Sequence, residues 1–192
     1  MLTTNIVNFD EVAPHIRGVM DSIPRSQFIP EVYNTEEYED MPVPIGEGVN
    51  CSKPSTIGYM MSLLTGKGTV LEIGTGCGWQ TALLTQLYDD VCSIEVNTFL
   101  YEKAKCNLKD YNVKLRYGNG MKGWNTDSKF DNIIVCAAIN HFPTNLIEQL
   151  NVGGVLVVPV INGEQQILHQ IVKTKDYFNC KIINECRFVE AI

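Results

Sequence analysis

The sequence has no apolar run that approaches the length of a membrane-spanning helix. Residues 1–5 also lack the charged start and the apolar core of a secretory signal peptide. We therefore expect a cytoplasmic protein with no membrane partner.

Positive charge is scarce as well. The chain has 15 Lys and Arg residues against 22 Asp and Glu residues, a net charge of −7, and no dense basic cluster. Non-specific binding to nucleic acid requires a basic face. The composition therefore argues against a nucleic-acid partner.

The cysteines lack the spacing of a metal site or a disulfide framework. There are seven of them, and none forms a C-x-x-C pair. Cys92 and Cys136 lie in apolar runs, where cysteine acts as a small hydrophobic side chain. This usage fits a reducing compartment, and no cysteine has an evident histidine partner for catalysis.

What the sequence does have is a glycine-rich turn between an apolar run at 70–73 and a helix-like segment at 79–88. The turn contains Gly74, Gly76 and Gly78. Dinucleotide-binding turns follow the pattern G-x-G-x-x-G, whose third glycine permits close packing of helix on strand. Trp79 occupies that third position here, which argues against NAD or FAD.

A second acidic strand end supports a nucleoside ligand. Residues 91–95 form an apolar run that ends in Glu95, about 20 residues beyond the first glycine. A carboxylate at this spacing is suited to hold a ribose diol.

The core of the chain alternates strand-like and helix-like segments, which predicts right-handed βαβ units and a parallel sheet. The predicted strands are 69–73, 91–95, 113–117, 130–138 and 155–160. The predicted helices are 79–88, 98–110 and 143–150, the last broken by residues 151–154. Segments 165–173 and 180–189 have no helix between them, so we expect an antiparallel closing pair.

The first 68 residues differ in character from the core at 69–192, although the length fits one domain. We expect a helix at 9–23, a turn at 23–30 and an irregular, proline-rich stretch at 38–46 that forms a lid or a substrate-facing shelf. A helix follows at 56–64. On the residues alone, Ser52 before a proline and a helix is best explained as a helix cap.

Several blocks spread over most of the chain resemble motifs of protein-L-isoaspartate (D-aspartate) O-methyltransferases. The blocks, with the family motifs in parentheses, are I-P-R-S-Q-F-I-P at 23–30 (V-P-R-x-x-F-V-P), Y-E-D-M-P-V-P-I-G at 38–46 (Y-x-D-x-P-L-P-I-G), C-S-K-P at 51–54 (I-S-x-P), L-E-I-G-T-G-C-G-W-Q at 71–80 (L-E-I-G-T-G-S-G-Y-Q), D-N-I-I-V-C-A-A at 131–138 (D-x-I-I-V-T-A-A) and C-R-F-V at 186–189 (V-R-F-V). The resemblance implies a Rossmann-like class I methyltransferase fold of seven strands, with helices on both faces and S-adenosyl-L-methionine as cofactor.

The resemblance also implies roles for individual residues. Ser52 corresponds to the family's active-site serine, so it is expected to act on the substrate and not only to cap a helix. The expected cofactor-binding residues are Glu72, Gly74, Thr75, Gly76, Cys77, Gly78, Gln80, Glu95, Val96, Asn119 and Gly120. The expected substrate-binding residues are Ile45, Gly46, Val49, Asn50, Cys51, Arg187, Phe188 and Val189. No metal ligand is expected.

Three departures from the family pattern concern this site. Asn119 stands where the family has an aspartate that faces the adenine, which removes a charge but keeps an acceptor oxygen. Val49 and Asn50 replace Q-T before the serine motif, and Glu190 and Ala191 replace P-L after R-F-V. The last two changes flank the expected peptide groove, which points to a shifted substrate range.

The reaction that the resemblance implies is methyl transfer to the free α-carboxylate of an L-isoaspartyl residue, which initiates repair through a succinimide. A carboxylate is ionised at neutral pH, so no general base is required. This agrees with the interpretation of His141 as an exposed loop residue, and of His15 and His169 as structural or surface residues.

Three other functions stay open. A divergent relative would methylate an aspartate of one dedicated peptide, but such homologues carry an added C-terminal region and this sequence ends at Ile192. A nucleic-acid methyltransferase is disfavoured by the acidity and by Cys136 and Ala137, where an N/D-P-P-Y motif would stand. An inactive S-adenosylmethionine-binding module is the third. We expect a monomer.

Overall fold

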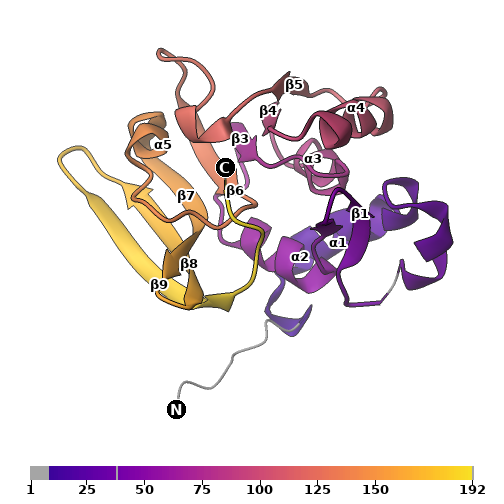
Figure 1. Cartoon of the computed structure of the whole chain (residues 1–192). Helices are drawn as coiled ribbons and strands as arrows, with labels where there is room; N and C mark the ends of the chain where they lie inside the picture. Colours follow the sequence, from indigo (N-terminus) through magenta and orange to yellow (C-terminus); the bar gives the residue numbers. More distant parts are fainter. Residues whose placement is uncertain (1–8, 38, 192) are drawn as a thin grey trace.

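In the computed structural model, which describes residues 9–37 and 39–191, a seven-stranded sheet forms the centre of the protein (Figure 1). Its strands lie in the order β5-β4-β3-β6-β7-β8-β9. Their bounds are Thr69–Ile73 (β3), Asp90–Glu95 (β4), Lys114–Tyr117 (β5), Phe130–Val135 (β6), Leu150–Asn162 (β7), Gln165–Lys173 (β8) and Phe178–Cys186 (β9). Strands β3 to β7 are parallel, and β8 and β9 are antiparallel. The predicted mostly parallel sheet is confirmed.

Two hydrophobic cores cover the two faces of this sheet, because alternate residues of a strand point to opposite sides. Val70 and Ile134 belong to the larger core, which also contains side chains of α1 to α4. Leu71 and Ile133 belong to the second core, together with Leu146 of α5. The helices are Pro14–Ser22 (α1), Pro54–Ser62 (α2), Trp79–Leu84 (α3), Thr98–Asn107 (α4) and Thr144–Glu148 (α5). Helices therefore lie on both faces, as expected.

The order of the strands locates the ligand site. The chain moves outward from β3 through β4 to β5 and then returns to place β6 on the other side of β3. Open α/β sheets bind their ligands at the carboxyl ends of the strands, where the strand order reverses. The loops after β3, β4 and β6 therefore form the expected binding edge.

The helices and the central strand are shorter than the apolar patterns predict. After Leu84 the backbone tightens, because the N–H of Gln86 bonds the carbonyl of Leu83 and that of Leu87 bonds the carbonyl of Leu84. These are three-residue spacings, which end an α-helix. The apolar periodicity continues through such a turn, so it overstates the helix. Helix 98–110 ends at Asn107, and strand 130–138 ends at Val135.

The predicted break at 151–154 is wrong, because these residues continue strand β7. The pairing of β6 with β7 runs from Phe130 opposite Leu150 to Asn132 opposite Val155, so the additional residues form a bulge. Gly153 has a positive φ of 86°, which a glycine adopts without strain. The glycines thus shape a strand here instead of ending one.

The N-terminal third also differs in detail from the prediction. The expected helix at 9–23 is divided into a 3₁₀ turn, Phe9–Glu11, and helix α1, because Pro14 starts a helix and cannot lie within one. The stretch at 38–46 contains strand β1, Val43–Gly46, which pairs with β2, Val49–Cys51. Residues 1–5, 38 and 192 lie outside the described residues.

Within residues 9–37 and 39–191, no helix combines the length and the apolar composition needed to cross a membrane.

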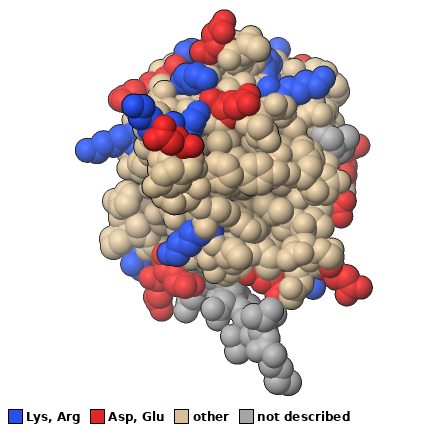
Figure 2. Space-filling view, turned by 90° about the vertical axis from the view of Figure 1, so that its left-hand side faces the viewer, with Lys and Arg blue, Asp and Glu red and all other residues tan. Residues whose placement is uncertain are grey.

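Seen from the side of β9, the surface has a broad central area without Lys, Arg, Asp or Glu (Figure 2). Strand β9 forms the edge of the sheet on this side, and its first half is exposed. Large apolar side chains such as Tyr177 and Ile182 lie in the open here. Charged residues gather mainly at the rim of this view.

Arg25 fastens the N-terminal segment to the loop before α2. Its side chain is only 1% exposed. Its Nη2 donates to the carbonyl of Met41 at 3.0 Å, of Cys51 at 3.2 Å and of Ser52 at 3.1 Å. One guanidinium thus joins three segments, and hydrogen bonds from a charged donor are stronger than neutral ones.

We predict that Arg25→Met lowers the free energy of unfolding by about 3 kcal/mol, because it leaves buried carbonyls without their charged donor. The measurement is urea denaturation. Arg17→Met is the matched control on α1, where no side-chain hydrogen bond is recorded among the described residues, and it should stay within about 0.5 kcal/mol of the parent. Equal effects of the two substitutions would contradict the assigned role of Arg25.

Candidate active site

A cavity of about 980 Å³ lies at the carboxyl ends of β3, β4 and β6. Residues from the loops after these three strands line one side of it. Other parts of the wall come from the β1–β2 hairpin, from the loop before α2 and the first turns of that helix, from the turn after β5, and from the end of β9 with the segment that follows it. The cavity is therefore where the topology places the ligand site, and it also touches the N-terminal third.

The glycine turn after β3 approaches the end of β4 closely. The N–H of Gly74 donates to the carbonyl of Ile94 at 2.8 Å, and the N–H of Gly76 donates to Glu95 Oε2 at 2.8 Å. Gly74 and Gly76 have positive φ values of 93° and 57°. The turn needs glycine at these two positions because other residues rarely adopt this conformation.

The carboxylate of Glu95 is held rigidly at the wall of the cavity. Its Oε1 accepts the N–H groups of Val96 and Asn97, both at 2.9 Å. Its Oε2 accepts only the N–H of Gly76 among the described residues. A carboxylate oxygen has two lone pairs, so Oε2 retains one for a ligand hydroxyl.

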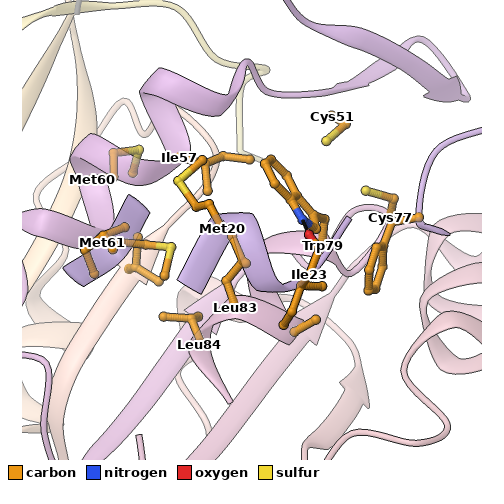
Figure 3. Close-up of a cluster of buried hydrophobic side chains, with 14 of the residues drawn as sticks. Met20, Ile23, Cys51, Ile57, Met60, Met61, Cys77, Trp79, Leu83 and Leu84 are labelled. Atoms are coloured by element: carbon orange, nitrogen blue, oxygen red, sulfur yellow. Dashed lines mark hydrogen bonds between the residues drawn. The ribbon is translucent and has the colours of Figure 1, made fainter. Parts of the chain in front are cut away.

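Gly78 has the packing role that the third glycine has in a dinucleotide-binding turn. It is the N-cap of α3 with a φ of 92°, and a Cβ there would lie 3.0 Å from Leu108 Cγ. Trp79 follows it and points away from the turn, donating from Nε1 to the carbonyl of Ile23 at 3.0 Å (Figure 3). The indole therefore ties α3 to the N-terminal segment.

The turn after β5 supplies the next part of the wall. Asn119 lines the cavity, and its Oδ1 accepts the N–H of Met121 at 2.8 Å, which caps the following 3₁₀ turn. A Cβ on Gly120 would lie 2.4 Å from Ile73 Cγ2, so this position requires glycine. An amide oxygen makes the capping bond as well as a carboxylate would, which explains how asparagine is accommodated here.

Ser52 lines the same cavity but does not cap α2. The N-cap of this helix is Lys53, which makes no capping bond through its side chain. Asp40 holds the helix start instead, since its two oxygens accept the N–H and the hydroxyl of Ser55, both at 2.7 Å. The hydroxyl of Ser52 makes no hydrogen bond to another described residue, so the expectation of a cap is wrong.

The C-terminal segment is held against the cavity by a side-chain amide and by backbone bonds to Ala138. Gln166 of β8 accepts the N–H of Phe188 at 2.6 Å and donates to its carbonyl at 3.0 Å. The carbonyl of Val189 accepts the N–H of Ala138 at 2.7 Å. These backbone groups are therefore engaged within the chain, and a peptide would contact this segment through its other atoms.

The structure brings most of the predicted site residues together around this cavity. Those that line it are Ser52, Gly74, Thr75, Gly76, Cys77, Gln80, Glu95, Val96, Asn119, Gly120, Ile45, Val49, Asn50, Cys51, Arg187, Phe188 and Val189. Glu72, Gly46 and Gly78 do not line it. Gly46 packs on Phe99, where a Cβ would lie 2.7 Å from Cε1 of the ring.

Glu72 lies buried behind the wall and not at its surface. Its Oε2 accepts the hydroxyls of Thr81 at 2.5 Å and Ser93 at 2.6 Å, whereas its Oε1 has no partner among the described residues. Burial raises the pKa of Glu72 to about 7, and the charge of Glu95 adds to the increase.

Sequence reasoning missed the residues that position the site. Arg25, Asp40 and Gln166 form hydrogen bonds to segments 15 to 27 residues away. No local pattern marks such pairs. The only available signal was the presence of Arg25 and Asp40 inside the resembling motifs.

The strand order, the glycine turn and the acidic end of β4 define the fold of a class I S-adenosylmethionine-dependent methyltransferase. A family model for protein-L-isoaspartate(D-aspartate) O-methyltransferase matches residues 4–192. The chain belongs to this family.

Individual relatives agree with the family match. A protein-L-isoaspartate O-methyltransferase of Pseudomonas aeruginosa is 40% identical over 184 residues, which cover 93% of this chain and 87% of that protein. The enzyme of that name from Pseudoalteromonas atlantica is 41% identical over 177 residues, covering 88% and 82%.

Two solved structures share the fold. A structure described as a protein-L-isoaspartate O-methyltransferase has a TM-score of 0.83 at 28% identity and covers 97% of this chain, which spans 63% of that one. A Plasmodium falciparum structure described in the same terms, in complex with S-adenosyl-L-homocysteine, has a TM-score of 0.81 at 22% identity, covering 94% and 91%.

We predict that Glu72→Gln changes the pH dependence of stability. Between about pH 4.5 and about pH 7 the folded protein retains the Glu72 proton that the unfolded chain releases, so stability falls as pH rises, with a limiting slope of about 1.4 kcal/mol per pH unit. Glutamine cannot ionise. In Glu72→Gln, urea denaturation across this range should therefore lack the fall in unfolding free energy that the parent shows as pH rises.

Glu102→Gln makes the same substitution at an exposed position on α4 and provides the comparison. Identical pH profiles for the parent and Glu72→Gln would contradict the assignment of the titration to Glu72.

Proposed function

We propose that this protein transfers a methyl group from S-adenosyl-L-methionine to the free α-carboxylate of L-isoaspartyl residues in damaged proteins or peptides. One observation carries the proposal. Ser52 and the glycine turn line the same cavity, although they belong to different parts of the chain. A cofactor in the turn and a substrate at the serine would therefore meet.

The residues present fit this cofactor. The free lone pair on Glu95 Oε2 suits a ribose hydroxyl, and the turn at Gly74 and Gly76 offers backbone without side-chain obstruction. Asn119 and Gly120 line the wall on the side expected for the adenine. When bound, the cofactor supplies an electrophilic methyl group on a sulfonium sulfur.

The protein's own contribution is to orient the acceptor. A substrate carboxylate is already ionised, so no base needs to remove a proton. The Ser52 hydroxyl, unpaired among the described residues, is available to donate to one carboxylate oxygen. Lys53, which lies 3.7 Å from Asp40, and Arg187 supply positive charge to a lining that also contains Glu185 and Glu190. The enzyme would accelerate methyl transfer by holding the other carboxylate oxygen in line with the methyl group.

We further propose that the whole chain acts as one domain, with residues 1–68 facing the substrate. We also propose a monomeric, cytoplasmic enzyme that does not bind nucleic acid, and the net charge of −7 supports the last of these points. Size-exclusion chromatography with light scattering tests the oligomeric state.

The function is tested with a pair of peptides that differ only in one isoaspartyl or aspartyl linkage. We expect label from radioactive cofactor to enter the isoaspartyl peptide alone, because only that isomer presents the displaced α-carboxylate. Equal labelling of both peptides would refute the repair function. Calorimetric titration with S-adenosyl-L-methionine distinguishes an inactive binding module, which binds without transferring label.

Ser52→Ala should lower kcat about 100-fold, the loss typical of one removed donor at a reacting centre. The affinity for S-adenosyl-L-methionine should change little, because Glu95 and the glycine turn stay in place. Ser22→Ala, an exposed serine at the end of α1, is the control for the same substitution outside the cavity. Loss of cofactor binding in Ser52→Ala would instead indicate a structural role.

A further inference from the structure

Two cysteines lie in the wall of the cavity, and the methyl transfer proposed above assigns no chemistry to either sulfur atom. Cys51 ends strand β2, directly before Ser52, and Cys77 lies in the glycine turn. Their residues are 5% and 4% exposed, and both line the cavity. Figure 3 shows the two sulfur atoms facing each other, each from its own segment.

A buried cation lies beside this pair. Arg25 donates to the carbonyl of Cys51 through Nη2, whereas its Nε and Nη1 are buried and have no hydrogen-bond partner among the described residues. No carboxylate forms an ion pair with Arg25 in the described part of the chain. A buried guanidinium with two unused donors favours an anion next to it, and the Cys51 thiol, on which the Arg25 charge acts, is a group able to become one.

The groups around Cys51 act in the same direction. The neighbouring Cys77 thiol and the charges of Arg25 and Lys103 lower the pKa of Cys51 to about 7 despite burial. When it is protonated, Cys51 Sγ donates to the carbonyl of Ser52 at 3.7 Å. The pKa of Cys77 rises well above its usual value, because its proton is shared with Cys51 and the site is buried. The two pKa values are thus pushed apart, so Cys51 is the sulfur of the pair that loses its proton first.

The family motifs quoted above have isoleucine and serine at these two positions. The cysteine pair is therefore a feature of this sequence and is not part of the family motifs. A thiolate next to a protonated thiol is the arrangement in which oxidation ends as a disulfide, because the second sulfur resolves the first product.

We propose that Cys51 and Cys77 form an oxidisable dithiol that reacts with hydroperoxides. The Cys51 thiolate attacks one peroxide oxygen, the O–O bond breaks, and the product is a sulfenic acid with release of water or an alcohol after protonation. The Cys77 sulfur then attacks the sulfenic sulfur, the S–O bond breaks, and the departing hydroxide takes up the Cys77 proton and leaves as water. Two thiols are oxidised to one disulfide, and one hydroperoxide is reduced.

This disulfide would join the loop that carries Ser52 to the turn that carries the glycines. We expect the disulfide to lower methyl transfer, and this expectation rests on the proposed function. The formation of the disulfide does not depend on that function. Measuring the disulfide by mass, separately from activity, distinguishes failure of one proposal from failure of the other.

The experiment exposes the reduced full-length protein to hydrogen peroxide, blocks remaining thiols with N-ethylmaleimide, and maps peptides by mass spectrometry without reduction. We expect a peptide linked through Cys51 and Cys77, with both residues lost from the alkylated pool and recovered after dithiothreitol. Recovery of both as alkylated thiols, while exposed Cys106 and Cys180 are oxidised, would overturn the proposal.

Two variants refine this test. Cys77→Ser removes the resolving sulfur, so the sulfenic acid on Cys51 should persist and be trapped by dimedone; absence of the adduct would contradict the order of steps. Cys106→Ser, the same change at an exposed position on α4, should leave the linked peptide unchanged. The map of the parent protein decides the question even if Cys77→Ser does not fold.

Discussion

The site depends on a buried guanidinium that is shared by three carbonyls. Arg25 joins the segments that contain Met41, Cys51 and Ser52, and its Cζ lies 5.6 Å from the centre of the Trp79 ring. Trp79 in turn begins the helix that follows the glycine turn. This cation and the bond from Trp79 to Ile23 thus connect the N-terminal third to the sheet, and together they help to set the position of the serine relative to the glycine turn.

The parts of the fold that the sequence predicts are those governed by local rules. The glycine turn, the acidic end of β4 and the alternation of strands and helices follow from backbone conformation and from the handedness of βαβ units. Element ends were less accurate, since apolar spacing continues through the turn after Leu84. The bulge in β7 could not be found locally, because it is defined by pairing with β6.

The site shows the same division. Glu95 and Ser52 follow from a spacing and from a motif, and both line the cavity. The residues that hold the site in shape act across long separations, and their bonds are made only after folding. Glu72 shows the opposite error: its place in a glycine-turn motif suggests ligand contact, whereas its side chain is fully buried and bonded to hydroxyls behind the wall.

The paired hydrogen bonds of Gln166 have a mechanical consequence. Strand β9 ends at Cys186, yet the carboxamide of Gln166 binds both backbone groups of Phe188 as a neighbouring peptide unit would. The side chain thereby replaces the backbone hydrogen bonds that a further pair of residues between β8 and β9 would make. Residues 187–191 therefore turn away from the sheet towards the cavity, and no additional strand is needed to hold them there.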